Sequence, residues 1–146
     1  MNKLNKFSKL NKFTYSADKI FLDTDIVIFL LKKEAKFVQP FLNFKNNNVR
    51  FFYNPIIKAE IYAGAFKKEY PIIENFFSYL ECIDINEEIG KAAGLYANEF
   101  KKPHSGISLE DFIIAATVKT NNLILWTNNV KHYPMKNIRL FDNFKV

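Results

Sequence analysis

Short runs of apolar residues alternate along the chain with stretches in which apolar positions recur every three or four residues. The short runs predict buried strands, and the longer periodic stretches predict helices. The predicted strands are Lys19–Leu22, Val49–Tyr53, Glu81–Ile85, Leu123–Trp126 and Ile138–Phe141. Strands that alternate with helices in this way are typical of an α/β fold with a parallel sheet covered on both faces. Such sheets bind ligands at the carboxyl ends of their strands.

The helix boundaries follow from capping residues. Asn54 and Pro55 suit an N-cap and a first helical position, and Asn86 precedes an acidic first turn. Asn121 and Asn122 suit the left-handed turn that ends a helix. The predicted helices span residues 25–33, 35–44, 55–66, 71–80, 86–100 and 108–119.

The chain divides into a short extension and one domain. Residues 1–18 are basic and contain a repeat of three residues, which drifts around an α-helix that repeats every 3.6 residues. We expect a low-complexity extension, or alternatively a basic arm that touches RNA or a partner. Residues 19–146 suit one compact domain.

Composition narrows the class of protein. The net charge of +6 favours a polyanionic partner, and nearly all the positive charge is lysine. Cys82 is the single cysteine, which excludes a disulfide within the chain and a cysteine zinc site, and we expect it to be buried in a strand. No apolar stretch approaches the ~18 residues of a membrane span, and no secretory signal is evident, so we expect a cytoplasmic protein without a membrane partner.

Three acidic residues occupy positions where the pattern calls for apolar ones. Asp23 ends a buried strand, and Glu60 and Asp111 fall on the apolar stripes of their helices. An isolated buried carboxylate is costly and needs a partner. If the three converge, a divalent cation is the simplest partner, which indicates metal-dependent phosphate chemistry. Oxygen ligands without His or Cys favour Mg²⁺ or Mn²⁺ over zinc.

Each acid also has a structural alternative. Asp23 and Thr24 suit the cap of the following helix, and Glu60 suits pairing with a lysine. Asp111 suits the third helical position of a capping box that Ser108 begins. These roles compete with the metal hypothesis at each position taken singly.

Four segments, in this order, resemble the motifs of PIN-domain nucleases. They are Phe21–Ile28, Ala59–Gly64, Asp111–Thr117 and Trp126–Tyr133. The last is close to the ending common in bacterial VapC-type toxins. The resemblance covers the chain from residue 19 to about residue 141.

The resemblance implies a three-layer α/β/α sandwich with a central parallel sheet and an acidic pocket that binds Mg²⁺ or Mn²⁺. It implies that Asp23, Glu60 and Asp111 are the catalytic metal-site acids. Thr24 and Thr127 would position water or phosphate, which makes Thr127 a further catalytic candidate.

Several neighbouring residues have open roles. Asn129 stands where many PIN domains carry a fourth acid, and Asp25 is either an extra acid at the site edge or a helix cap. His132 is either a packing residue or a participant in catalysis. Tyr133 suits base stacking or the core, and His104 has no partner that the sequence indicates.

The resemblance therefore implies an endoribonuclease of the VapC toxin type, with structured or single-stranded RNA as substrate. Such a protein would be neutralised by a small antitoxin and would form a homodimer. Two alternatives stay open: a PIN nuclease of RNA processing without an antitoxin, and an inactive module that binds RNA or protein.

Overall fold

The computed structural model describes residues 19–141 and contains a single five-stranded sheet. All neighbouring strands are parallel, in the order β3-β2-β1-β4-β5. The strands are β1 (Lys19–Leu22), β2 (Arg50–Tyr53), β3 (Glu81–Cys82), β4 (Ile124–Trp126) and β5 (Arg139–Phe141). Each of the five predicted strands is present. The largest difference is in β3, which ends at Cys82 instead of Ile85.

Six α-helices and two 3₁₀ turns connect the strands. The helices are α2 (Thr24–Leu31), α3 (Ala35–Asn46), α4 (Pro55–Ala63), α5 (Tyr70–Ser78), α6 (Glu87–Phe100) and α7 (Leu109–Thr120), and the turns are η1 (Lys67–Glu69) and η2 (Val130–His132). The expected caps form, since the Asn54 side chain accepts from Ile57 N and Asn122 has a φ of 52°. Helix α4 is shorter than predicted and ends at Ala63, before Gly64.

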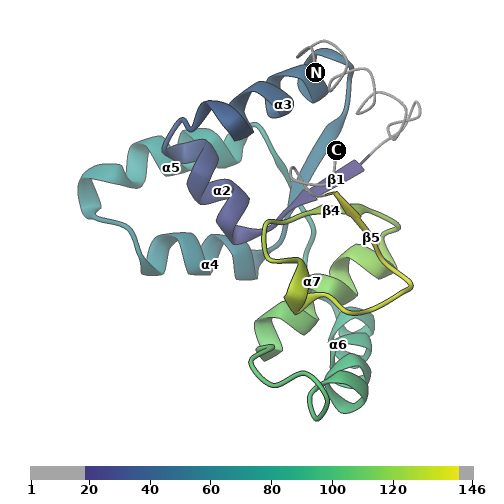
Figure 1. Cartoon of the computed structure of the whole chain (residues 1–146). Helices are drawn as coiled ribbons and strands as arrows, with labels where there is room; N and C mark the ends of the chain where they lie inside the picture. The colour runs from purple at the N-terminus through teal and green to yellow at the C-terminus, as the bar shows by residue number, and fades with distance from the viewer. Residues whose placement is uncertain (1–18, 142–146) are drawn as a thin grey trace.

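The helices cover both faces of the sheet, as predicted. Figure 1 shows α2, α3, α4 and α5 on one side and α6 and α7 on the other. Right-handed crossovers explain the division, because the chain moves outward from β1 to β3 and then returns past β1 to β4. Strands β2 and β3 are thus added on one side of β1, and β4 and β5 on the other. The point between β1 and β4 where the strand order reverses is where open α/β sheets bind ligands.

An aromatic cluster packs β4 and β5 against α3. The Trp126 ring lies 5.9 Å from that of Phe44 and 5.3 Å from that of Phe141, both edge-on. Phe21 in β1 and Trp126 in β4 are fully buried. Edge-to-face rings pack with defined geometry, and the parallel pairing of β1 with β4 aligns the carboxyl ends of these two strands.

A buried polar bridge joins α4 to α7. Asn54 is fully buried, and its Nδ2 donates to Thr117 Oγ1 at 3.0 Å. Thr117 Oγ1 in turn donates to the Ile113 carbonyl at 2.8 Å. Because each of these buried polar groups has a partner, the bridge is favourable and specific. It sets the distance between the helices that carry Glu60 and Asp111.

One expectation, the burial of Cys82, is wrong, and another concerns residues that the structure does not describe. Cys82 is exposed and not buried, because β3 is an edge strand and the chain leaves the sheet after it. The extension of residues 1–18 lies outside the described residues. Between residues 19 and 141, no helix is long and apolar enough to cross a membrane.

Candidate active site

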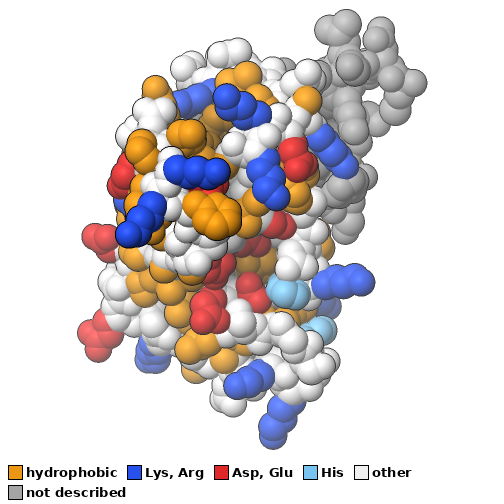
Figure 2. Space-filling view, turned by 90° about the vertical axis from the view of Figure 1, so that its left-hand side faces the viewer, with side chains coloured by type: hydrophobic (Ala, Val, Ile, Leu, Met, Phe, Trp, Pro, Cys, Tyr) orange, Lys and Arg blue, Asp and Glu red, His pale blue; other side chains and the backbone are white. Residues whose placement is uncertain are grey.

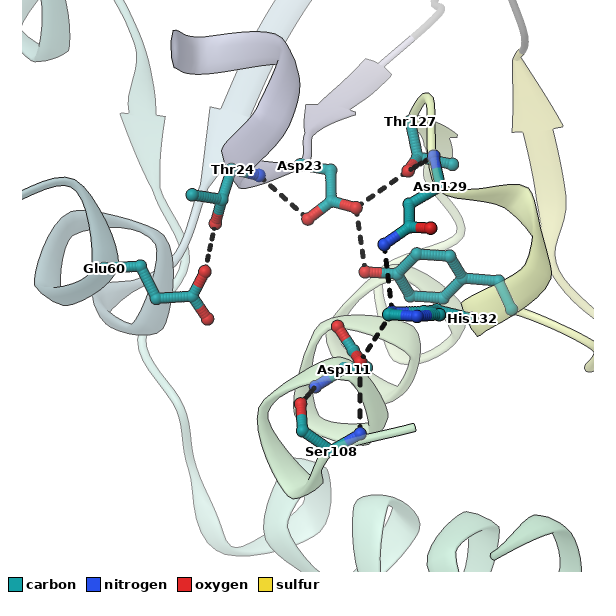
Figure 3. A network of polar contacts seen from close by, with 9 residues as sticks. Asp23, Thr24, Glu60, Ser108, Asp111, Thr127, Asn129 and His132 are labelled. Carbon is teal, nitrogen blue, oxygen red and sulfur yellow. Dashed lines mark hydrogen bonds and ion pairs between the residues drawn. The ribbon is translucent and has the colours of Figure 1, made fainter. Parts of the chain in front are cut away.

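Asp23 lies at the reversal point, directly after β1, and three groups of the chain hold its carboxylate (Figure 3). Its Oδ2 accepts from Thr127 Oγ1 at 2.8 Å and from the Tyr133 hydroxyl at 3.0 Å. Its Oδ1 accepts from Thr24 N at 2.8 Å, so Asp23 also caps α2. The predicted capping role and a place in the site therefore coexist in one side chain.

The surroundings of Asp23 disfavour its charge. Burial raises the pKa of Asp23, the hydrogen bonds from Thr127, Thr24 and Tyr133 oppose that rise, and the charge of Asp111 adds to it. Burial and the nearby Asp23 charge also raise the pKa of Tyr133 well above its usual value. The Tyr133 hydroxyl therefore stays protonated and acts as a donor.

Glu60 faces the same region from α4. Its Oε2 accepts a hydrogen bond from Thr24 Oγ1 at 2.6 Å. Thr24, rather than a lysine of the described chain, is thus its partner. Burial raises the pKa of Glu60, Thr24 lowers it, and the charges of Asp23 and Asp111 raise it further. The charges of Asp23 and Asp111 therefore act on Glu60, so the three acids interact electrostatically.

Asp111 enters from the first turn of α7 and has two kinds of partner. It forms the predicted capping box, in which Ser108 N donates to Asp111 Oδ2 at 3.1 Å and Asp111 N donates to Ser108 Oγ at 3.3 Å. The same Oδ2 lies 3.0 Å from His132 Nδ1. His132 Nδ1 also lies 3.0 Å from Asn129 Nδ2. His132 and Asn129 therefore belong to the edge of the acidic site.

Asp25 stabilises the loop after β4. Its Oδ2 accepts from Asn128 N at 3.0 Å, and its Oδ1 accepts from Ile26 N at 2.8 Å. Burial, and then the charge of Asp23, raise the pKa of Asp25 to about 6. Asp25 thus ties α2 to the loop that carries Thr127 and adds negative charge near Asp23.

The carboxylates of Asp23, Glu60 and Asp111 face a common space from three separate elements (Figure 3). Within residues 19–141, however, no three His, Cys, Asp or Glu side chains form a ready group of ion ligands. Glu60 is turned to Thr24, and Asp111 is turned to Ser108 and His132. The donor chemistry still fits a hard divalent cation, because Asp23 and Glu60, whose pKa is raised by burial and by neighbouring charge, gain from a nearby positive charge.

Sequence patterns did not reveal two contacts of the site. Tyr133 is buried and donates to Asp23 instead of offering a face for stacking. Asp25 anchors Asn128, a contact between residues far apart in the chain. The fourth motif contained both the tyrosine and the loop, but no local pattern in it specifies their partners. Thr127, by contrast, was expected at the site and lies against Asp23.

The chain matches a family model, characterised relatives and solved structures. The family model described as PIN domain matches residues 20–136. The chain is 30% identical over 114 residues to Ribonuclease VapC19 of Mycobacterium tuberculosis, covering 78% of this chain and 91% of that protein. It is 32% identical over 120 residues to Ribonuclease VapC2 of Haemophilus influenzae, covering 79% and 89%. The crystal structure of DNA-bound VapBC from Salmonella typhimurium aligns with a TM-score of 0.75 and 25% identity, over 86% of this chain and 98% of that one.

Proposed function

Because the chain belongs to the PIN-domain family and is a VapC-type member of it, we propose that it is a metal-dependent endoribonuclease, the toxin of a toxin–antitoxin pair. The observation that carries the proposal is the approach of Asp23, Glu60 and Asp111 from three elements to one space at the reversal point of the sheet. The names of the relatives supply the reaction class, which is ribonuclease.

The acids would hold Mg²⁺ or Mn²⁺. Asp23 and Asp111 are the proposed ligands, and Glu60 is a further ligand or orients the attacking water. When bound, such an ion lowers the pKa of a water and stabilises negative charge on a phosphoryl oxygen. In the proposed hydrolysis, water would lose a proton and form a bond to phosphorus. The bond from phosphorus to the ribose oxygen of the neighbouring nucleotide would break, and that oxygen would take up a proton.

The chain's own residues orient the acids. Thr127 and Tyr133 each donate to Asp23 Oδ2, which fixes the rotation of this carboxylate. Thr24 donates to Glu60 through its hydroxyl and to Asp23 through its amide. Preorganised partners of this kind reduce the reorganisation needed during reaction.

The charge distribution supports a nucleic-acid substrate. Figure 2 shows acidic side chains gathered across the middle of one face, with Lys and Arg side chains above and below them. Lys32, Lys33, Lys67 and Lys68 are exposed. Lysines around an acidic centre attract the phosphates that flank the bond to be cut.

A small antitoxin and a second copy of the chain are the proposed protein partners. The Salmonella structure is of a VapBC complex, which supports an antitoxin. Exposed apolar side chains such as Ile72, Tyr79 and Leu95 are available for protein contacts. Co-purification of the chain with the product of an adjacent small reading frame, followed by mass measurement in solution, tests both partners.

The decisive experiment is cleavage-site mapping on total RNA with Mn²⁺, with Mg²⁺ and with chelator. Discrete cuts that require metal and disappear in Asp23→Asn support the endoribonuclease. RNA binding without cuts under every metal condition would favour the inactive module, for which the amide at Asn129 in place of an acid is the motivating observation.

A further inference from the structure

A cavity of about 680 Å³ opens beside the acidic site, between the loop after α6 and the loop after β4. Two of its lining residues also belong to the acidic site, since His132 contacts Asp111 and Tyr133 donates to Asp23. His132 and Tyr133 therefore lie between the cavity and the acidic centre, which are neighbours. Nothing in the proposed chemistry at the acids uses the rest of this cavity.

The polar lining that residues 19–141 give the cavity contains a lysine and no carboxylate, in contrast to the acidic centre. The chain has two histidines, His104 and His132, and both line this cavity together with Lys131 and Ser105. None of the described residues that line it is acidic. An imidazole has at least one N–H donor in either protonation state, and a lysine ammonium is a mobile point charge, so the set suits a phosphate.

The remaining walls suit a flat ring. Pro103 and Pro134 line the cavity, and the His104 ring lies 6.1 Å from the ring of Phe100, which supports it from α6. The volume falls within the range of roughly 300–1,000 Å³ for small-molecule sites. A planar imidazole beside proline surfaces offers a stacking partner for a nucleobase.

We propose that this cavity binds the nucleotide next to the bond that is cut, with its phosphate on Lys131 and His104 and its unpaired base against the imidazole and proline walls. The inference rests on the proposed function and deepens it, because a base inserted here is not base-paired. The substrate segment is thus single-stranded at the cut, whether it comes from a free strand or from a loop of a folded RNA.

Binding is measured on the full chain in chelator, so that no RNA is cut. Imidazole signals of ¹⁵N-histidine-labelled protein are followed while adenosine 5′-monophosphate, short single-stranded RNA of random sequence, or duplex RNA is added. Because there are only two histidines, their signals are readily assigned with a His104→Gln variant. The expected result is a saturable shift of both signals with the mononucleotide and the single strand, and a much smaller shift with the duplex.

Variants test the contacts. His104→Ala and Lys131→Gln are each expected to weaken single-stranded RNA binding about tenfold and to raise KM more than they change kcat. Lys131→Gln should also reduce the slope of the logarithm of the binding constant against the logarithm of the salt concentration by about one, because one phosphate contact is lost. The matched control is Lys91→Gln, an exposed lysine of α6 outside the cavity lining, which should leave RNA affinity and the salt slope unchanged.

The outcomes separate this inference from the proposed function. Histidine shifts with single-stranded RNA but no cleavage in any metal would defeat the nuclease proposal and leave the nucleotide site standing. Cleavage with wild-type RNA affinity in both His104→Ala and Lys131→Gln would overturn the nucleotide site. Loss of antitoxin binding in these variants with unchanged RNA affinity would assign the cavity to the protein partner and also overturn it.

Discussion

Thr127 Oγ1 donates to Asp23 Oδ2 at 2.8 Å and so joins two residues that are 104 positions apart in the chain. Thr127 is fully buried, and the same hydroxyl oxygen accepts from Asn129 N at 2.9 Å. One hydroxyl therefore orients both the carboxylate at the end of β1 and the loop that follows β4. Its loss would affect the geometry of the site and the stability of the fold together.

Thr127→Val keeps the shape of the side chain and removes the hydroxyl. We expect the free energy of unfolding to fall by about 1–3 kcal/mol, because the buried Asp23 carboxylate loses a donor and the part-buried Asn129 N–H loses its acceptor. RNA cleavage should fall as well, since Asp23 retains only Tyr133 on Oδ2. Urea denaturation and initial cleavage rates measure the two effects. Thr127→Ser is the matched control and should recover most of both, whereas a fully active and fully stable valine variant would contradict the role of the hydroxyl.

Asp23→Asn is expected to abolish metal-dependent cleavage while the fold persists. The amide is of similar size, and removal of a buried charge that repels Asp111 should keep or raise the melting temperature without metal. Asp111→Asn should likewise abolish cleavage. Glu110→Gln, an exposed neighbour in α7, is the control and should remain active. Cleavage by either aspartate variant within about threefold of the wild-type rate would reject these assignments.

The metal-free protein should lose stability as pH rises through the titration of Asp25. The ordinary pKa of 3.8 becomes about 6 in the folded state, so the folded chain binds more protons than the unfolded chain between these values. The contribution of Asp25 is complete below about pH 4 and is lost by about pH 6. Thermal denaturation in chelator across this window measures it.

Asp25→Asn provides the comparison for that experiment. Glu74 and Glu81 have a lowered pKa and contribute the opposite slope, but they do so equally in wild type and variant. Asp23 and Glu60 have a raised pKa and contribute a slope of the same sign as Asp25. Because the Asp23 charge acts on Asp25, the difference between the two proteins reports Asp25 together with its coupling to Asp23. A melting temperature difference that stays constant from pH 4 to pH 6 would show that Asp25 does not titrate as proposed.

Asn129→Asp should add a fourth carboxylate at the edge of the acidic centre. The side chain of Asn129 already contacts His132, which contacts Asp111. Without metal, added repulsion should lower the melting temperature, and with Mn²⁺ the stabilising shift should grow because cation affinity rises with ligand charge. Paired melting curves with Mn²⁺ and with chelator test this. An unchanged metal-dependent shift would place residue 129 outside the ion's reach.

Much of the fold could be predicted because local patterns determine it. Buried parallel strands appear as apolar runs, as in Lys19–Leu22, and Asn54 followed by Pro55 marks a helix start by capping chemistry alone. The sequence alone did not show which strand lies at the edge of the sheet. Cys82 has the composition of a buried strand residue, but its exposure depends on β3 being at the edge of the sheet, which no local pattern specifies.

The candidate site was predictable where acidic residues occupy positions that the helix and strand patterns would fill with apolar ones. Glu60 interrupts an apolar stripe, and its carboxylate accepts from Thr24 at the edge of the space that Asp23 and Asp111 also face. The orientation of each carboxylate was not predictable, because it depends on hydrogen bonds between distant segments. His132 illustrates this. It contacts Asp111 at the acidic site because the loop after β4 lies against the first turn of α7, and the sequence does not specify that contact.

Strand β1 comes first among the strands of residues 19–141 but lies in the middle of the sheet, between β2 and β4. Asp23 gains Thr127 and Tyr133 as partners only after β4 has been synthesised and has inserted beside β1. Domains generally fold as units during synthesis, and contacts this distant in sequence require the later segment to be present. A nascent chain still bound to its ribosome would therefore carry the separate acids without the assembled centre. If the protein cuts RNA, as proposed, the order of its strands keeps it inactive until β4 and the loop that carries Tyr133 have been made and have packed beside β1.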